Sequence, residues 1–152
     1  MILLGNFFLV LLLQTPAPVS TVVVGLIDGR QVVLDNPEFL GFIHGRGPEA
    51  VLAYQGDKIH GRLPASAISR IDFAEYNKEE PFAMTITLKN GQKLNVRPEM
   101  SRYLTVRGNN GNGTVYINHP DPISTVLRLS TKKPNRKNDL TIQYLEFPAP
   151  TE

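Results

Sequence analysis

Two copies of the tetrapeptide Ile-His-Gly-Arg are the residues of this chain best suited to chemistry. The first copy supplies His44 and Arg46, and the second copy, sixteen positions later, supplies His60 and Arg62. If the copies converge, their guanidiniums could bind an anionic group, because each presents a fork of N–H donors. With His119 the imidazoles could instead ligate a metal, although zinc ligands usually lie at short spacings within one element. The simpler interpretation leaves both His-Gly-Arg ends at loops, and we predict neither a metal nor a cofactor.

Catalytic motifs are missing from the sequence. Asp28 is followed directly by Gly29, and Asn90 stands at the matching place further on, so the paired carboxylates of an aspartic protease cannot form. The chain has no cysteine and no Gly-x-Ser-x-Gly turn. We therefore expect a protein that is not an enzyme. A catalytic triad or carboxylate pair assembled only in three dimensions stays open as an alternative.

A short aromatic segment is the candidate contact surface. Phe39 and Phe42 follow Asn36-Pro37 within four residues of one another. Both apolar faces of this segment cannot easily be buried at once, and an exposed part would offer a partner or ligand surface. Together with His44, Arg46, His60 and Arg62, these phenylalanines are the predicted site residues.

The N-terminal segment predicts where the protein works. Residues 1–20 carry no charged side chain, and residues 2–13 are almost continuously apolar before the sequence Thr-Pro-Ala-Pro. This pattern is typical of a signal peptide followed by a cleavage zone of small residues. An uncleaved anchor and a cytosolic core segment are the alternatives, but about twelve apolar residues are fewer than the roughly twenty that span a bilayer. With no cysteine for a disulfide, we expect a bacterial periplasmic or secreted protein.

The remainder of the chain is β-patterned and contains an apparent internal repeat. Residues 22–39 and 84–100 each run from an apolar segment through Asp-Gly or Asn-Gly to a second apolar segment and then Pro-Glu. We expect Asn90-Gly91 to form a type I′ hairpin turn. Residues 64–68 predict a single helical turn before a strand, and residues 140–147 predict a closing strand, placed to complete the sheet of the other unit.

These features divide the chain into a signal peptide (1–20), a first unit (21–74), a linker (75–81), a second unit (82–147) and a tail (148–152). Several short strands, an early hairpin and a helical turn before the last strand make each unit resemble the small SH3-like or Sm-like β-barrels. The resemblance is to tandem units found in exported bacterial proteins of unassigned function. It implies an all-β protein of two tandem small SH3-like β-barrel or sandwich units packed together. RNA binding of the Sm-like kind does not carry over, because no nucleotide-binding motif is visible.

Composition and charge point to a binding role. Sixteen Lys and Arg against 14 Asp and Glu give a formal net charge of +2, whereas nucleic-acid binding usually shows a concentrated basic face. We expect an exported, non-enzymatic protein that binds a protein partner in the cell envelope through edge strands and the loop from Phe39 to Arg46. A small anionic or glycan ligand is the alternative, and a hydrolase is less favoured. We expect no nucleic-acid partner, and membrane contact only through an uncleaved leader; the sequence predicts no particular oligomeric state.

Overall fold

The structure is a computed structural model that describes residues 19–42, 45–46, 50–74, 83–99, 104–119 and 142–149. These residues form an all-β protein, as predicted. The strands are β1 (Thr21–Leu26), β2 (Gln31–Leu40), β3 (Val51–Gln55), β4 (His60–Pro64), β5 (Ile68–Phe73), β6 (Met84–Leu88), β7 (Lys93–Pro98), β8 (Leu104–Asn109), β9 (Thr114–His119) and β10 (Ile142–Glu146). The predicted helical turn is a 3₁₀ helix, η2 (Ala65–Ala67), between β4 and β5. The predicted linker and residues 1–18 of the predicted leader lie outside the described residues.

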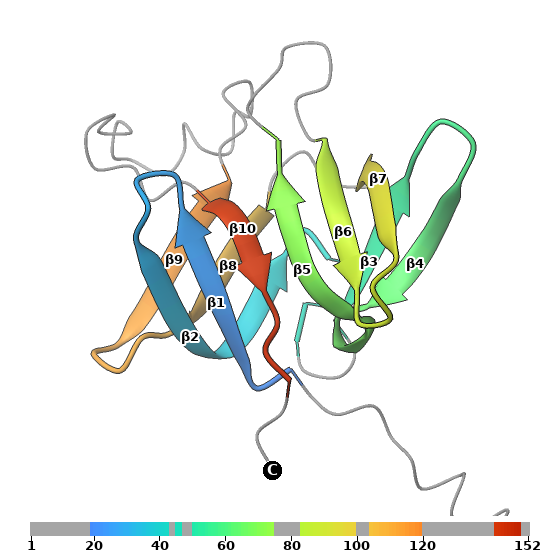
Figure 1. Cartoon of the computed structure of the whole chain (residues 1–152). Helices are drawn as coiled ribbons and strands as arrows, with labels where there is room; N and C mark the ends of the chain where they lie inside the picture. The colour runs from blue at the N-terminus through green and yellow to red at the C-terminus, as the bar shows by residue number, and fades with distance from the viewer. Residues whose placement is uncertain are drawn as a thin grey trace, which may run out of the picture.

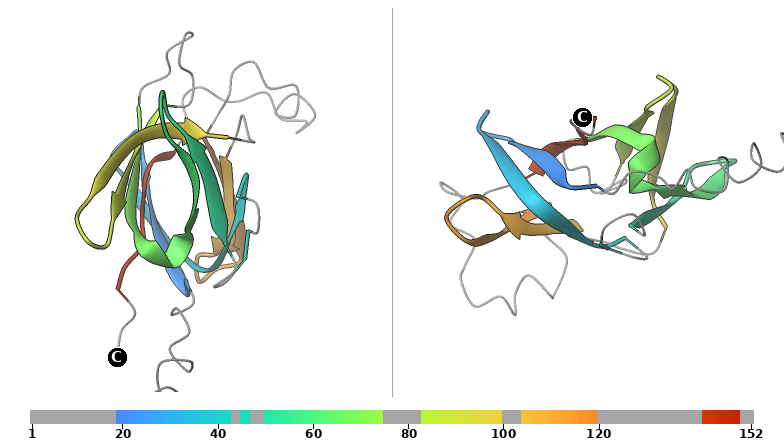
Figure 2. Two further views of the ribbon diagram at one scale, coloured as in Figure 1. Left: turned by 90° about the vertical axis from the view of Figure 1, so that its right-hand side faces the viewer. Right: turned by 90° about the horizontal axis from the view of Figure 1, so that it is seen from below.

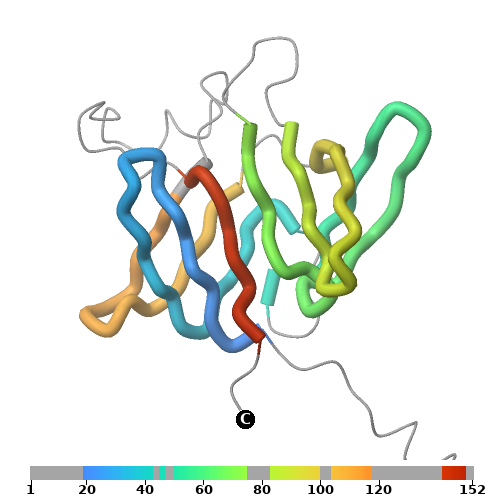
Figure 3. The backbone as a smooth tube through the Cα atoms, in the orientation of Figure 1, coloured from blue at the N-terminus to red at the C-terminus, as the bar shows by residue number. Residues whose placement is uncertain are grey.

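All ten strands belong to one open antiparallel sheet (Figure 1). Their order is β4-β3-β7-β6-β5-β10-β1-β2-β8-β9. Strands β5 and β10 lie at its centre and divide it into two halves of five strands, which stand side by side in Figure 3. Seen from below and from the side, the sheet bends strongly instead of lying flat (Figure 2).

The strand order is symmetric with respect to the predicted repeat. Exchanging β1 with β6, β2 with β7, β3 with β8, β4 with β9 and β5 with β10 turns the order into its own reverse. Each half therefore takes its first hairpin from one repeat and its second hairpin from the other: β2 pairs with β8, and β3 pairs with β7. The predicted closing strand, β10, pairs with β1 and β5 of the first repeat, so its placement in the other unit's sheet is confirmed.

This exchange corrects the expectation that, apart from the closing strand, each unit forms its sheet from its own strands. A unit of this size, alone, would bury only about 60% of the surface that its unfolded chain exposes. The exchanged hairpins instead share one core cluster that draws buried side chains from both repeats. Period-two alternation in the sequence fixes which face a strand buries but not which strand it pairs with.

The two repeats meet at a central pair of residues. Ile71 of β5 and Leu145 of β10 are direct cross-strand partners, and both side chains are buried. Leu145 also pairs with Val24 and Ile71 with Ile86, so four buried side chains line up across the seam. This row is the point at which the two halves become one structure.

The outer face of the seam is polar. The guanidinium of Arg70 lies 3.9 Å from the ring centroid of Tyr144, and its nitrogens lie 2.9 Å from Asp72 and 3.7 Å from Glu146. These contacts join β5 to β10 on the side opposite the buried row. The seam is therefore held on both faces.

Matching turns open the two repeats, and their type differs from the prediction. Gly29 and Gly91 have φ of 88° and 87°, while Asn36 is the one described non-glycine residue with positive φ. Leu88 N–H donates to Gln92 O at 2.8 Å and Gly91 N–H to Leu88 O at 2.9 Å, with the same pattern around Gly29. Three-residue loops ending in a left-handed glycine fit this pattern, and the predicted type I′ turn does not.

Because strands of both repeats share one core, we expect a single unfolding transition. Leu145→Ala should lower the free energy of unfolding by about 2–5 kcal/mol, since it removes buried methyl groups and leaves a cavity. Denaturant unfolding followed by far-UV circular dichroism and by tyrosine fluorescence measures this. Two resolved transitions, with only one moved by Leu145→Ala, would show instead that the repeats fold independently.

Candidate functional site

Strand β2 bends in its middle and thereby shapes the first candidate site. The register of β2 against β8 shifts between Asp35 and Glu38, and Asn36 adopts a positive φ of 49° immediately before Pro37. Asn36 N–H donates to Ser20 O at 2.9 Å, which fixes the bend against the start of the described chain. After this bulge the faces of β2 are exchanged, as bulges commonly do.

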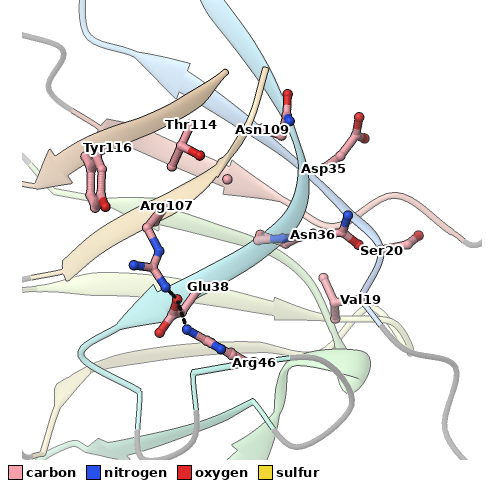
Figure 4. Close-up of a pocket in the computed structure, with 12 residues that line it drawn as sticks. Val19, Ser20, Asp35, Asn36, Glu38, Arg46, Arg107, Asn109, Thr114 and Tyr116 are labelled. Carbon is pink, nitrogen blue, oxygen red and sulfur yellow. Dashed lines mark hydrogen bonds and ion pairs between the residues drawn. The ribbon is translucent and has the colours of Figure 1, made fainter. Parts of the chain in front are cut away.

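A polar hollow of about 730 Å³ lies beside this bend (Figure 4). It is lined by Val19, Ser20, Asp35, Asn36, Pro37, Glu38, Arg46, Arg107, Gly108, Asn109, Thr114 and Tyr116. The residues come from β2, β8 and β9, from the segment before β1 and from the chain after β2. The polar hollow is therefore built by both repeats.

Glu38 is the centre of the charges in the polar hollow. Its Oε2 atom accepts a hydrogen bond from Arg107 Nη2 and lies 3.0 Å from Arg46 Nη2, as the dashed lines in Figure 4 mark. The Glu38 side chain is 18% exposed, against 31% for Arg107 and 73% for Arg46. Asp35 adds a second carboxylate, so the two acids and two arginines cancel, and the hollow suits a neutral polar ligand better than an anion.

Tyr116 offers an apolar surface at the rim of the polar hollow. Its side chain is exposed, and the Arg107 guanidinium lies 5.8 Å from its ring centroid. The amide side chains of Asn36 and Asn109 line the same hollow. An exposed ring with neighbouring amide groups can pack against an apolar face and hydrogen-bond at its edges.

The predicted aromatic surface is wrong, because the structure buries both phenylalanines. Phe39 is 1% and Phe42 9% exposed; their rings stack at 4.9 Å, and Phe147 lies 5.5 Å from Phe39. The bulge in β2 reverses the alternation so that Phe39 points inward, and the chain returns after Leu40 to place Phe42 against it. Leu40 remains partly exposed.

The structure separates the predicted basic residues. Arg46 lies in the polar hollow, bridged to β2, whereas His60 and Arg62 lie on β4, at the far edge of the sheet order. His44 falls outside the described residues, as does the side chain of His119. The convergence of Arg46 with His60 and Arg62 that the anion-binding alternative requires is therefore not found. The preferred interpretation, which left the second His-Gly-Arg at a loop, is also wrong, because His60 and Arg62 lie on β4.

Strand β4 forms the second candidate site, an open sheet edge. It pairs with β3 over five residues, while β3 contacts β7 through only Tyr54↔Pro98 and Gln55↔Arg97. The opposite edge strand, β9, curls back until its Cα atoms lie within 8 Å of those of β10. In Figure 1 the β3–β4 hairpin stands at the right-hand margin of the sheet. Within the described part of the chain, no strand pairs with the outer side of β4.

Register places cationic side chains on one face of this edge. His60, Gln55 and Arg97 form one row across β4, β3 and β7, and Arg62 lies opposite Ala53 on the same face. Lys93 of β7 shares this face, which we call the cationic face after Arg62, Lys93 and Arg97; His60 lies on it too, and all four are exposed. The opposite side carries Leu52, Leu63 and Val96. The two arginines and the lysine of the cationic face make no ion pair within the described part of the chain.

No protein-family model matches the chain, and neither curated proteins nor solved structures gave a significant match. Within residues 19–149, gaps excepted, no three His, Asp or Glu side chains are placed to hold a metal ion. No helix among the described residues has the length and apolarity to cross a membrane.

The Glu38 network should contribute to stability mainly through Arg107. Glu38→Gln and Arg107→Gln should each lower the free energy of unfolding by about 1–2 kcal/mol, because each leaves a partly buried charge without its partner. Arg46→Gln should change it by less than about 0.5 kcal/mol, because this arginine is exposed. A double-mutant cycle on Glu38 and Arg107, followed by denaturant unfolding, measures their coupling. Equal effects of the two arginine substitutions would contradict this assignment.

Proposed function

We propose that this chain is an exported, non-enzymatic binding protein of the bacterial cell envelope, and that it docks a protein partner at the edge of its sheet. The observation that carries this proposal is that β4 ends the sheet, with no described strand on its outer side. An edge strand presents unpaired backbone N–H and C=O groups, and a strand from a partner can pair with them. Each half of the sheet would be an SH3-like unit assembled from both repeats, and the approach of β9 to β10 supports such closure in one half.

Site-specific photo-cross-linking in the producing cell tests where the partner docks. Ile59 precedes β4 and is 46% exposed, while Val33 on β2 is 53% exposed and lies in the other half. A photo-reactive residue at position 59 should give a cross-linked product of defined mass, because it would lie beside the docked strand. The same residue at position 33 is the control. Products from both positions alike, or from neither, would contradict docking at this edge.

The export proposal predicts where the mature chain begins. Val19 packs against the core, and Ser20 O accepts the Asn36 N–H that fixes the bend in β2. Cleavage after Ser20 would remove both contacts, so we expect a mature N-terminus at or before Val19. Fractionation of the producing cell followed by mass spectrometry of the N-terminal peptide measures this. An intact Met1 in the cytosolic fraction would contradict export.

A neutral glycan bound in the polar hollow is the second candidate. The exposed ring of Tyr116 in a hollow that Asn36 and Asn109 also line favours it, as does the pairing of both arginines with Glu38. Binding to an array of envelope oligosaccharides should be lost in Tyr116→Ala, because the ring would supply the apolar contact. Val33→Ala is the matched control for an exposed side chain on another strand. Retained binding in Tyr116→Ala would remove this candidate.

A further inference from the structure

We propose that the segment docked at β4 is an extended acidic strand whose carboxylates stand at alternate positions and face the cationic face. This inference rests on the proposed function and adds the chemistry of the partner. Its basis is the separation of charge between the two halves of the sheet, together with the register of β4.

The two halves differ in charge although their strands correspond. The hairpins β6–β7 and β3–β4, with Glu99 directly after β7, carry five Lys or Arg against two Asp or Glu, a net charge of +3. The hairpins β1–β2 and β8–β9 carry two Arg against three Asp or Glu, a net charge of −1. Among these described hairpins, positive charge is therefore concentrated in one half, which we call the basic half. An acidic partner would gain electrostatically from binding there.

The cations of the basic half are also free to meet a partner. Arg30, Arg46, Arg70 and Arg107 each form an ion pair with a carboxylate. The unpaired Lys and Arg of the described residues all lie in the two hairpins of the basic half: Lys58, Arg62, Lys89, Lys93 and Arg97. A partner would therefore not have to displace a carboxylate of the described residues.

The alternation of β4 sets the pattern that the partner must have. His60 and Arg62 point to the cationic face, while Gly61 and Leu63 point to the other side. In an added strand, side chains opposite His60 and Arg62 lie on the cationic face, two positions apart. The partner side chain between these two positions lies on the other side of the sheet, beside Leu63 and the Tyr54 ring. The Tyr54 hydroxyl oxygen would lie 2.7 Å from a Cβ atom added to Gly61. The partner should therefore alternate acidic and apolar residues.

The symmetry-related edge provides an internal comparison. Hairpins β3–β4 and β8–β9 have the same register at their ends, Gln55↔His60 and Asn109↔Thr114. Where β4 has His60 and Arg62, β9 has Thr114 and Tyr116. The opposite edge therefore lacks a counterpart of Arg62, and an acidic strand should prefer β4.

Fluorescence anisotropy with labelled peptides and the mature full chain tests the inference. The probe is an eight-residue peptide that alternates Glu with Val. Its controls are a peptide of the same composition with the Glu residues clustered, and one with Gln in place of Glu. The alternating peptide should bind more tightly than either control, by about two- to fivefold over the Gln peptide, since a Glu opposite Arg62 forms one favourable cross-strand charge pair. Arg62→Gln and Arg97→Gln should weaken it, whereas Arg30→Gln, in the other half, should not.

Backbone N-methylation separates strand addition from simple charge attraction. Alternate amides of an added strand point toward β4 and the others point away. N-methyl groups on one alternate set should therefore abolish binding of the alternating peptide, while N-methyl groups on the other set should leave it.

Each other outcome overturns a defined part of the account. Equal binding of the Glu and Gln peptides, with the N-methyl effect retained, overturns the acidic partner but leaves the proposed docking at β4. Charge-dependent binding that neither N-methyl set affects overturns strand addition and with it the proposed function. Tighter binding of anionic vesicles or DNA than of the alternating peptide, dependent on Arg62 and Arg97, assigns the cationic face to a different class of partner and also overturns the inference.

Discussion

The antiparallel pairing of β5 with β10 is the interaction on which the rest of this structure depends. Ile71 and Leu145 meet in it directly, with buried partners on both sides. Each strand also joins the first hairpin of a different repeat, β5 through β6 and β10 through β1. Loss of this pairing would leave two incomplete five-stranded halves, each with another exposed edge. The seam thus explains how two small repeats obtain one core large enough to fold.

The exchange of hairpins also determines where the surface can act. The first part of β2 pairs with β1 and its second part pairs with β8, so the strand bends at Asn36 and Pro37. That bend turns Phe39 into the core and brings Glu38 to Arg107, 69 residues away in the chain. At the ends of the sheet the two edges are not equivalent: β9 curls toward β10, while β4 stands apart with its cations unpaired. The strand order is therefore symmetric, while the side chains and surroundings of the two edge strands differ.

Local features could be predicted from the sequence, and long-range ones could not. Alternation in residues 84–97 predicted the β6–β7 hairpin, and the Ala-Ser-Ala segment predicted the 3₁₀ turn. Neither the partner of each hairpin nor the left-handed Asn36 before a proline was predicted, because alternation fixes the buried face of a strand and not its neighbour. For that reason the burial of both Phe39 and Phe42 was not predicted.

The candidate sites depend on the same long-range contacts. Arg46 and the cations of β4 were chosen for a repeated tetrapeptide, yet the structure places them in different sites. Glu38, Arg107 and Tyr116 gave no local signal. In the sequence, Lys93 and Arg97 were only the polar residues of an alternating strand. Their place on the cationic face became clear once β7 was found beside β3. The basic half itself was hidden by the near balance of charge over the whole chain.

Amide hydrogen exchange of the full chain, with and without the alternating Glu–Val peptide, resolves strand addition at β4 residue by residue. We expect alternate amides of β4, those pointing away from β3, to exchange freely in the unbound protein and to become protected on binding. Amides of β9 should keep their exchange rates. Protection spread over the cationic face without any change in β4 amides, or protection of β9 instead, would contradict the account.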